Sequence, residues 1–363
     1  MTAGRKCERF FGQFFCVAVG IFFSVHAYGQ DVCSRNLETA QRQFDEGRFY
    51  SVEPLLSECL NSGFTRQERL NALELLALTK LYLDELDQAD SVYLDLLRLD
   101  PERKINEAVD PPDLVFLHNH FKTKPVFYWA IIGGINFSIP TIIHDYSVFD
   151  LEETDENPKA KLGFEGGVNI EFNVYQNLYM GGELLYVRKN FLYTDEAKFY
   201  SMERSVGYTI SQVEANNYIA VPVFLKYMIG EERVRPYFYG GLSTDFLMFT
   251  TQRDIGRESP LEEDPVEITS RDITKLRNTV NLTGIVGLGV MVKSGGLSLF
   301  ALDLRVMPGL TNITKESSRY ADQAGLISSG VVSDAMRINS ISLSVRFITP
   351  YYNPKLKKKI GRK

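Results

Sequence analysis

Residues Lys161 to Lys189 read KLGFEGGVNIEFNVYQNLYMGGELLYVRK and predict two β-strands joined by a tight turn at Gln176-Asn177. In the first strand, apolar and polar residues alternate without a break, which places them on opposite faces. The apolar face carries Phe164, Gly166, Val168, Ile170, Phe172 and Val174. Soluble strands usually stop near five or six residues, whereas a strand that crosses a bilayer needs roughly 9–11. The stretch therefore predicts a membrane-spanning hairpin.

The composition is compatible with that interpretation. The chain has 363 residues, of which 44% are hydrophobic and 24% are charged. A transmembrane barrel has such ordinary values because half of each strand is polar. The 19 Tyr and 24 Phe residues, against one Trp, fit a strand-rich chain. The net charge of −6 gives no reason to expect nucleic-acid binding.

Residues 1–29 have the pattern of a secretory signal peptide. Basic Arg5, Lys6 and Arg9 precede the apolar run from Phe10 to Val25, and small residues stand before Gln30. The alternative is an uncleaved membrane anchor, although the apolar run is short for one. We expect export, and no other segment approaches 18 consecutive apolar residues.

Residues 30–105 have helical periodicity instead. The segment from Leu70 to Pro101 resembles a tetratricopeptide repeat, and an earlier, weaker copy precedes it. The packing positions of that repeat fall on Ala77, Ala89, Tyr93 and Pro101. Two small alanines let the paired helices approach, and the proline ends the second helix. The surface could be a groove that binds a partner or a small cap on its neighbour.

Two repeats are fewer than the three that usually make such an array stable. After cleavage the chain keeps two cysteines, Cys33 and Cys59, in an oxidising compartment. A disulfide between them would close a loop of about 26 residues and contribute roughly 3 kcal/mol. The alternative is a pair of free buried thiols.

Residues 106–124 are expected to be a linker with one short helix, residues 125–350 a β-barrel, and residues 351–363 a basic tail. Six of the last nine residues are basic, so the tail could meet anionic headgroups or peptidoglycan, or be a solvated end. Eight strands are predicted: Val126–Ile139, Leu162–Tyr175, Leu178–Lys189, Tyr218–Met228, Arg235–Phe249, Val280–Val292, Leu297–Met307 and Asn339–Ile348.

The connections between these strands alternate in length. Long polar loops are predicted at Pro140–Lys161, Asn190–Asn217, Thr250–Thr279 and Pro308–Ile338, and short turns lie between them. An even strand count with this alternation is typical of bacterial outer-membrane barrels, in which the short turns face the periplasm. The fold class is therefore mainly β, an eight-stranded antiparallel transmembrane barrel, with a small helical domain on the periplasmic side.

Several short motifs carry a family resemblance. They are GGINFS (133–138), GGELLYVRK (181–189), NYIAVPVFLKY (217–227), RPYFYGGLS (235–243), TGIVGLGV (283–290) and DLRVMPGLTNI (303–313). In this order the region 126–348 resembles the PorT-type outer-membrane β-barrel family. The resemblance implies an eight-stranded barrel in the outer membrane of a Gram-negative bacterium. The founding member is linked to the type-nine secretion system, but the helical segment is not part of the family pattern.

An eight-stranded barrel is just wide enough for side chains to fill it. Strand parity points seven charged residues inward, where opposite charges can pair. These residues are Glu165, Glu171, Glu183, Lys226, Asp303, Arg305 and Arg346. The favoured interpretation is a structural ionic network in the lumen, and the alternative is a proton or ion path.

The sequence offers little support for catalysis. His118 and His120 are two residues apart, so they do not share a helix face, and His144 lies in a predicted loop. A Ser-His-carboxylate set on the lipid face, as some outer-membrane enzymes have, would need a histidine within a strand. We therefore predict no catalytic residues, no cofactor and no metal.

Three functions remain open. The first is a non-enzymatic outer-membrane barrel whose periplasmic helical domain docks a protein partner, in secretion or envelope assembly. The second is a structural or adhesive barrel that acts through its exterior loops, with the helical domain only a cap. The third is a soluble periplasmic β-protein. In the first two the barrel also contacts outer-membrane lipid.

Overall fold

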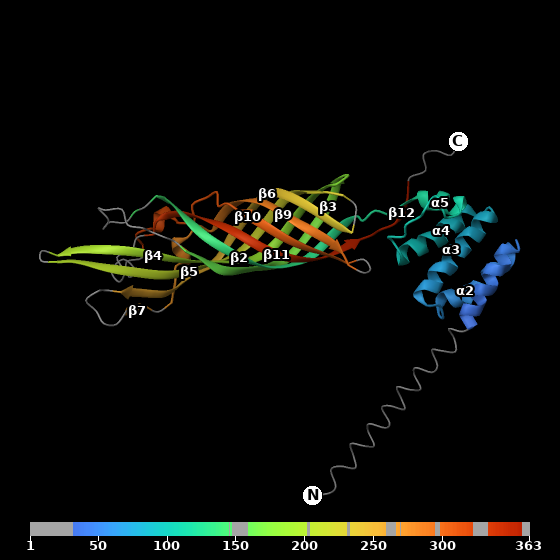
Figure 1. Ribbon diagram of the computed structural model, residues 1–363, viewed down its shortest axis with the longest axis horizontal. Coiled ribbons are helices and arrows are strands. Elements are labelled where there is room, and N and C mark those ends of the chain that lie inside the picture. Colours follow the sequence, from blue (N-terminus) through green and yellow to red (C-terminus); the bar gives the residue numbers. More distant parts are fainter. Residues whose placement is uncertain are drawn as a thin grey trace, which may run out of the picture. The chain divides into compact units, whose positions relative to one another are not determined.

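The computed structural model describes residues 32–144, 146, 159–201, 204–230, 233–258, 266–268, 270–294, 298–321 and 333–357. The predicted signal peptide lies outside these residues. The chain divides into two compact units, a helical unit of residues up to Pro125 together with those from Tyr352, and a barrel unit, Val126–Tyr351. Figure 1 shows the helices and the long strands in these separate parts.

The barrel unit consists of long antiparallel strands (Figure 1). They are β2 (Phe127–His144), β3 (Lys159–Tyr175), β4 (Leu178–Ser201), β5 (Arg204–Met228), β6 (Val234–Glu258), β9 (Val280–Lys293), β10 (Leu299–Met307) and β11 (Ala335–Tyr351). Neighbours pair in the order β5-β4-β3-β2-β11-β10-β9-β6, and β5 also pairs with β6. That last pairing closes the sheet into a ring of eight strands.

Residue alternation fixes which side of each strand faces inward. Burial along β10 alternates strictly from Leu299 to Met307. Phe300 is 45% exposed and Leu302 is 53% exposed, whereas Asp303 and Arg305 are 0% and 1% exposed. An apolar exterior over a polar interior is the arrangement that a barrel adopts in lipid. The interior is therefore where the charged side chains of the strands gather.

Two predicted loops contain long strands instead, and β2 also runs on to His144, which was predicted to lie in a loop. Residues 190–201 continue β4 and residues 204–217 continue β5, paired from Asn190↔Ala215 out to Ser201↔Arg204. Strand β6 likewise runs to Glu258, and β7 (Val266–Ile268) and β8 (Arg271–Asp272) pair with it. Outside the membrane both faces of a sheet can be polar, so the alternation that signals a strand disappears there. The loop prediction for these residues was wrong for that reason.

The helical unit begins with a helix over residues 32–45. It continues with η1 (Phe49–Ser51), α2 (Val52–Asn61), α3 (Arg66–Tyr82), α4 (Leu86–Leu99) and α5 (Pro112–Asn119). The turn before η1 uses Gly47 at φ 74°, a conformation that glycine adopts without strain. Thr65 and Glu68 form a reciprocal capping box that starts α3. None of the described helices combines the length and the hydropathy that a membrane-crossing helix needs.

The unit extends beyond the boundary that the sequence predicts. Leu114 and Leu117 of α5 are 0% and 1% exposed and pack with Phe121 against α3 and α4, so this segment belongs to the helical core rather than to a linker. The chain also returns after the barrel, because β12 (Lys355–Leu356) pairs with β1 (Phe121–Lys122). The backbone of residues 355–357 is therefore part of this unit, although the three side chains are exposed.

Candidate functional site

The barrel interior contains a connected set of charged side chains. The seven residues that strand parity points inward are each at most 4% exposed: Glu165, Glu171, Glu183, Lys226, Asp303, Arg305 and Arg346. They come from β3, β4, β5, β10 and β11. Because a buried charge is costly unless it is paired, the contacts among these residues decide whether the interior is stable.

Arg346 is the most highly connected of these residues. Its Nη1 lies 2.9 Å from Glu183 Oε1 and 3.5 Å from Glu171 Oε1, and its Nε pairs with Asp303. The guanidinium also lies 5.8 Å from the ring centroid of Phe224. One cation thus compensates carboxylates from three different strands, so it fastens β11 to β3, β4 and β10.

Arg305 and Lys226 complete the network. Arg305 Nη1 donates to Glu183 Oε2 at 2.9 Å, and its Nη2 lies 3.5 Å from Glu165 Oε1. Glu165 also accepts a 2.6 Å hydrogen bond from the Ser342 hydroxyl. Lys226 Nζ pairs with Glu171. Every charged member of the network therefore has an opposite charge beside it.

Large apolar and aromatic side chains fill the rest of the interior. Met228, Met291, Leu299 and Ile348 belong to one buried cluster near the short-turn ends of their strands. Gly181 leaves the space that the Phe224 ring occupies, since a Cβ there would lie 2.5 Å from the ring. The described interior is thus a packed core, as expected for eight strands.

Sequence reasoning missed two further buried pairs. Lys189 Nζ donates to Asp245 Oδ2 at 2.8 Å, and Arg277 Nε donates to Glu214 Oε1 at 2.8 Å. All four side chains are at most 5% exposed. Glu214 and Arg277 lie in segments predicted as loops, which hid them. Asp245 lies inside a predicted strand, so its inward parity is a signal that could have identified it.

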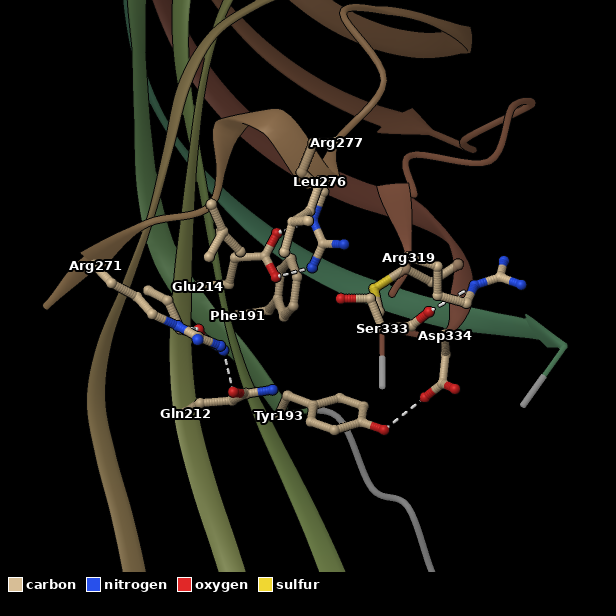
Figure 2. A pocket seen from close by; sticks show the side chains of 13 residues that line it. Phe191, Tyr193, Gln212, Glu214, Arg271, Leu276, Arg277, Arg319, Ser333 and Asp334 are labelled. Carbon is tan, nitrogen blue, oxygen red and sulfur yellow. Dashed lines mark hydrogen bonds and ion pairs between the residues drawn. The ribbon is translucent and has the colours of Figure 1, made fainter. Parts of the chain in front are cut away.

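A small cavity lies at the end of the barrel opposite the short turns. It is lined mainly by polar residues of β4, β5, β6, β8, η2 (Thr274–Leu276) and β11. Figure 2 shows Tyr193 and Asp334 pointing toward each other, with the hydroxyl donating at 2.6 Å. Arg271 Nε donates to Gln252 at 2.6 Å. The cavity volume is about 30 Å³, which holds only one or two waters. It is therefore too small for an organic ligand.

The helical unit has an apolar core and a disulfide between Cys33 and Cys59, whose Cα atoms are 5.7 Å apart. Ala77, Ala89 and Tyr93 are 0% exposed. Pro101 is also buried and follows the end of α4. These four predicted packing residues therefore lie in or beside one core.

One histidine of the helical unit lies at the edge of that core. His118 Nδ1 forms a 3.0 Å hydrogen bond with the Tyr93 hydroxyl. Burial, and after it the positive charges of Arg103 and Lys357, lower the pKa of His118 below its ordinary value. The neutral ring is therefore favoured near neutral pH. Among the described residues, no group of three or more His, Cys, Asp or Glu could hold a metal ion.

Three ring side chains meet at the surface of the helical unit: Phe44 and Phe49, which are half-buried, and Tyr82, which is exposed. Together with the exposed Phe116 of α5 we call them the aromatic face. Phe49 stacks on Tyr82 with ring centroids 5.2 Å apart, and Phe44 lies 5.6 Å from Tyr82. The Tyr82 hydroxyl donates to Asp113 at 2.9 Å, three residues before Phe116 on α5. Tyr82 is 51% exposed and Phe116 is 52% exposed. Large exposed aromatics of this kind are common at protein interfaces.

The closed ring, its apolar exterior and its ionic interior define a transmembrane β-barrel of the outer-membrane type. The family model described as "Outer membrane protein beta-barrel domain" matches residues 116–315, more than half of the chain. The chain belongs to this family and is an outer-membrane protein of a Gram-negative bacterium.

Two solved structures illustrate the likeness. Neisserial surface protein A (NspA) is 12% identical, with a TM-score of 0.29, over 61% of this chain and 97% of its own. The outer membrane protein OprG from Pseudomonas aeruginosa is 11% identical, with a TM-score of 0.29, over 64% of this chain and 98% of its own. Such low values carry no argument about function. No curated protein matches the sequence.

Proposed function

We propose that the barrel is a closed anchor in the outer membrane and that the helical unit docks a protein partner in the periplasm, within a machine for secretion or envelope assembly. The observation that carries this proposal is the aromatic face, with Tyr82 and Phe116 each about half exposed. The described interior of the barrel is packed with side chains, so we place the docking surface on the helical unit.

The topology supports a periplasmic helical unit. Strand β2 begins and β11 ends at the side of the short turns, which faces the periplasm in outer-membrane barrels. The chain therefore leaves the barrel on that side at both connections to the helical unit. Helix pairs around Ala77, Ala89 and Tyr93 support a repeat of the tetratricopeptide type, a fold that commonly presents a binding surface.

The charge of the helical unit indicates what kind of partner it would bind. The acidic part of the unit is residues 32–125, with 17 Asp and Glu against 11 Lys and Arg, whereas residues 352–363 add six Lys and Arg at the other end of the chain. Asp45 and Glu46 follow Phe44 directly, and Asp113 bonds to Tyr82. Aromatic faces and carboxylates together attract Lys and Arg side chains. We therefore expect a partner with a basic segment.

Affinity capture from detergent-solubilised outer membrane tests the proposal. The double variant Phe49→Ala/Phe116→Ala should lower partner recovery by about tenfold or more, because aromatic anchors dominate binding energy. Arg98→Ala is the matched control, since Arg98 is an exposed residue of α4 outside the aromatic face. Removal of residues 30–119, which takes away all the helices of the unit, should abolish recovery. Equal recovery from the wild type and the double variant would contradict the docking function.

A second function is favoured by a separate observation. Strands β4, β5 and β6 have 24, 25 and 25 residues, although a strand needs only about 9–11 to cross the membrane. A long sheet that extends beyond the membrane with both faces in water is suited to attach the cell to another surface. Replacing residues 192–212 by a short turn should then abolish binding of whole cells to their target surface and leave periplasmic partner capture unchanged. If whole-cell binding persists, attachment does not depend on this sheet.

A further inference from the structure

The C-terminal segment of the chain starts beside the aromatic face. The Lys357 amide donates to the His120 carbonyl at 2.7 Å, and its Nζ donates to the Asn119 carbonyl at 2.7 Å. The chain thus leaves β12 at the C-terminal end of α5. We propose that Lys358–Lys363 bind the aromatic face of their own helical unit and compete there with an outside partner.

The segment is long enough for this contact. Helix α5 has eight residues and is therefore about 12 Å long. Six extended residues span up to about 20 Å. The Phe116 ring lies 4.4 Å from the His120 ring, whose carbonyl receives the Lys357 amide. A chain that turns back along α5 from Lys357 passes Phe116 first and can reach Asp113 and Tyr82.

The charges of the segment and the face are complementary. Residues 355–363 contain six basic residues and no acidic residue, against an excess of six carboxylates in residues 32–125. Asp113 accepts a hydrogen bond from Tyr82, and Asp84 follows Tyr82 by two residues in the sequence. Asp45 directly follows Phe44. On this side Arg48 is paired with Glu46 at 3.5 Å. Lys and Arg side chains can therefore meet both carboxylates and ring faces.

A weak contact is sufficient because the segment is tethered. Exposed ion pairs contribute little individually, but a short tether gives an effective concentration on the order of millimolar. The face would then be occupied in the resting chain, and a partner with several basic and apolar groups could displace the segment. The segment is thus an intramolecular competitor, and a partner must bind the aromatic face more tightly than the segment does in order to displace it.

A disulfide-trapping experiment tests the contact in the full chain, held in nanodiscs of zwitterionic lipid without any partner. Phe116→Cys combined with Ile360→Cys should form an intramolecular disulfide. Arg98→Cys with Ile360→Cys is the control, because Arg98 lies away from the aromatic face. Its neighbour Leu99 accepts a hydrogen bond from Arg66, at the opposite end of α3 from Tyr82. Adding Lys358→Glu and Lys359→Glu to the first pair should lower its yield about fivefold or more, since the attraction becomes repulsion.

Three outcomes would overturn the proposal. The first is an equal disulfide yield for the Phe116 and Arg98 pairs. The second is a disulfide yield that does not change on charge reversal, and the third is a disulfide that joins two molecules instead of closing within one. Phe116 and Arg98 are exposed, so both variants keep the helical core intact. The trapping experiment contains no partner, so a failure to form the disulfide does not contradict the docking function. A failure to capture a partner likewise does not contradict the disulfide result. If both hold, a chain that ends at Lys357 should recover more partner than the wild type.

Discussion

Arg346 and Glu183 of the barrel are 1% and 4% exposed, while Val345, the neighbour of Arg346, is 53% exposed. In the helical unit the apolar Leu96 and Leu97 are 0% exposed, and Arg98 beside them keeps 64% of its side chain exposed. The barrel thus buries the charges of its strands and exposes an apolar outer face, whereas the helical unit buries apolar side chains and exposes charged ones.

The surrounding medium explains the difference. Lipid accepts the apolar exterior of the barrel, so strand parity leaves the polar residues for the interior. Water surrounds the helical unit, so burial of apolar side chains stabilises it. The two units therefore depend on different interactions, and a substitution can weaken one without the other.

The largest effect is expected for Arg346→Met. The substitution removes the cation that compensates Glu171, Glu183 and Asp303, and should destabilise the barrel by about 3–5 kcal/mol, because uncompensated buried charge remains. Urea unfolding in bilayers, followed by heat-modifiable gel migration, measures the loss. Val345→Leu on the lipid face is the control and should have almost no effect. If both variants unfold alike, the network does not stabilise the barrel.

A smaller effect is expected for loss of the disulfide. Cys33→Ser/Cys59→Ser should destabilise the helical unit by roughly 3 kcal/mol, because the loop of about 26 residues is no longer closed in the unfolded chain. Pulse proteolysis in urea reports on the helical unit, and gel migration reports on the barrel. Reduction of the wild type should reproduce the change. A parallel loss in the barrel would show that the units are not independent.

Strand positions and inward parity could be predicted from the sequence where lipid imposes alternation. Beyond Lys189 the alternation ends, so the extensions of β4 and β5 and the buried Glu214 could not be found. Strand parity shows that a side chain points inward but not which side chain it pairs with. Lys189 and Asp245 come from β4 and β6, which both pair with β5, and the two side chains meet across β5 inside the barrel.

The helical unit shows a similar limit. The apolar spacing of Leu114, Leu117 and Phe121 predicts a helix face, but the sequence does not say which surface that face covers. The structure packs it against α3 and α4. The aromatic face also combines residues 72 positions apart, Phe44 and Phe116, which no local pattern connects. Sequence periodicity gives elements, and only the fold gives the surfaces they share.

A still smaller effect is expected for Ala89→Leu. Ala89 is 0% exposed between packed helices, so three added carbons should destabilise the helical unit by about 1–3 kcal/mol. Gln88→Leu, at the exposed neighbouring position, should change stability by less than about 0.5 kcal/mol. Pulse proteolysis in urea compares the two variants with the wild type. Equal midpoints for all three chains would mean that Ala89 is not tightly packed.

The smallest effect is the pH dependence of the helical unit alone. The folded unit holds the pKa of His118 below its ordinary value, whereas the unfolded chain has a pKa near about 6.5. As pH falls below that value the unfolded chain binds the proton first, so the stability from neutral His118 is complete above it and is lost on acidification toward the lower folded pKa. His118→Asn keeps an acceptor for the Tyr93 hydroxyl but does not titrate. The urea midpoint of the wild-type unit should therefore fall between about pH 7.5 and about pH 5 more than that of the variant, and equal falls would exclude His118 as the titrating group.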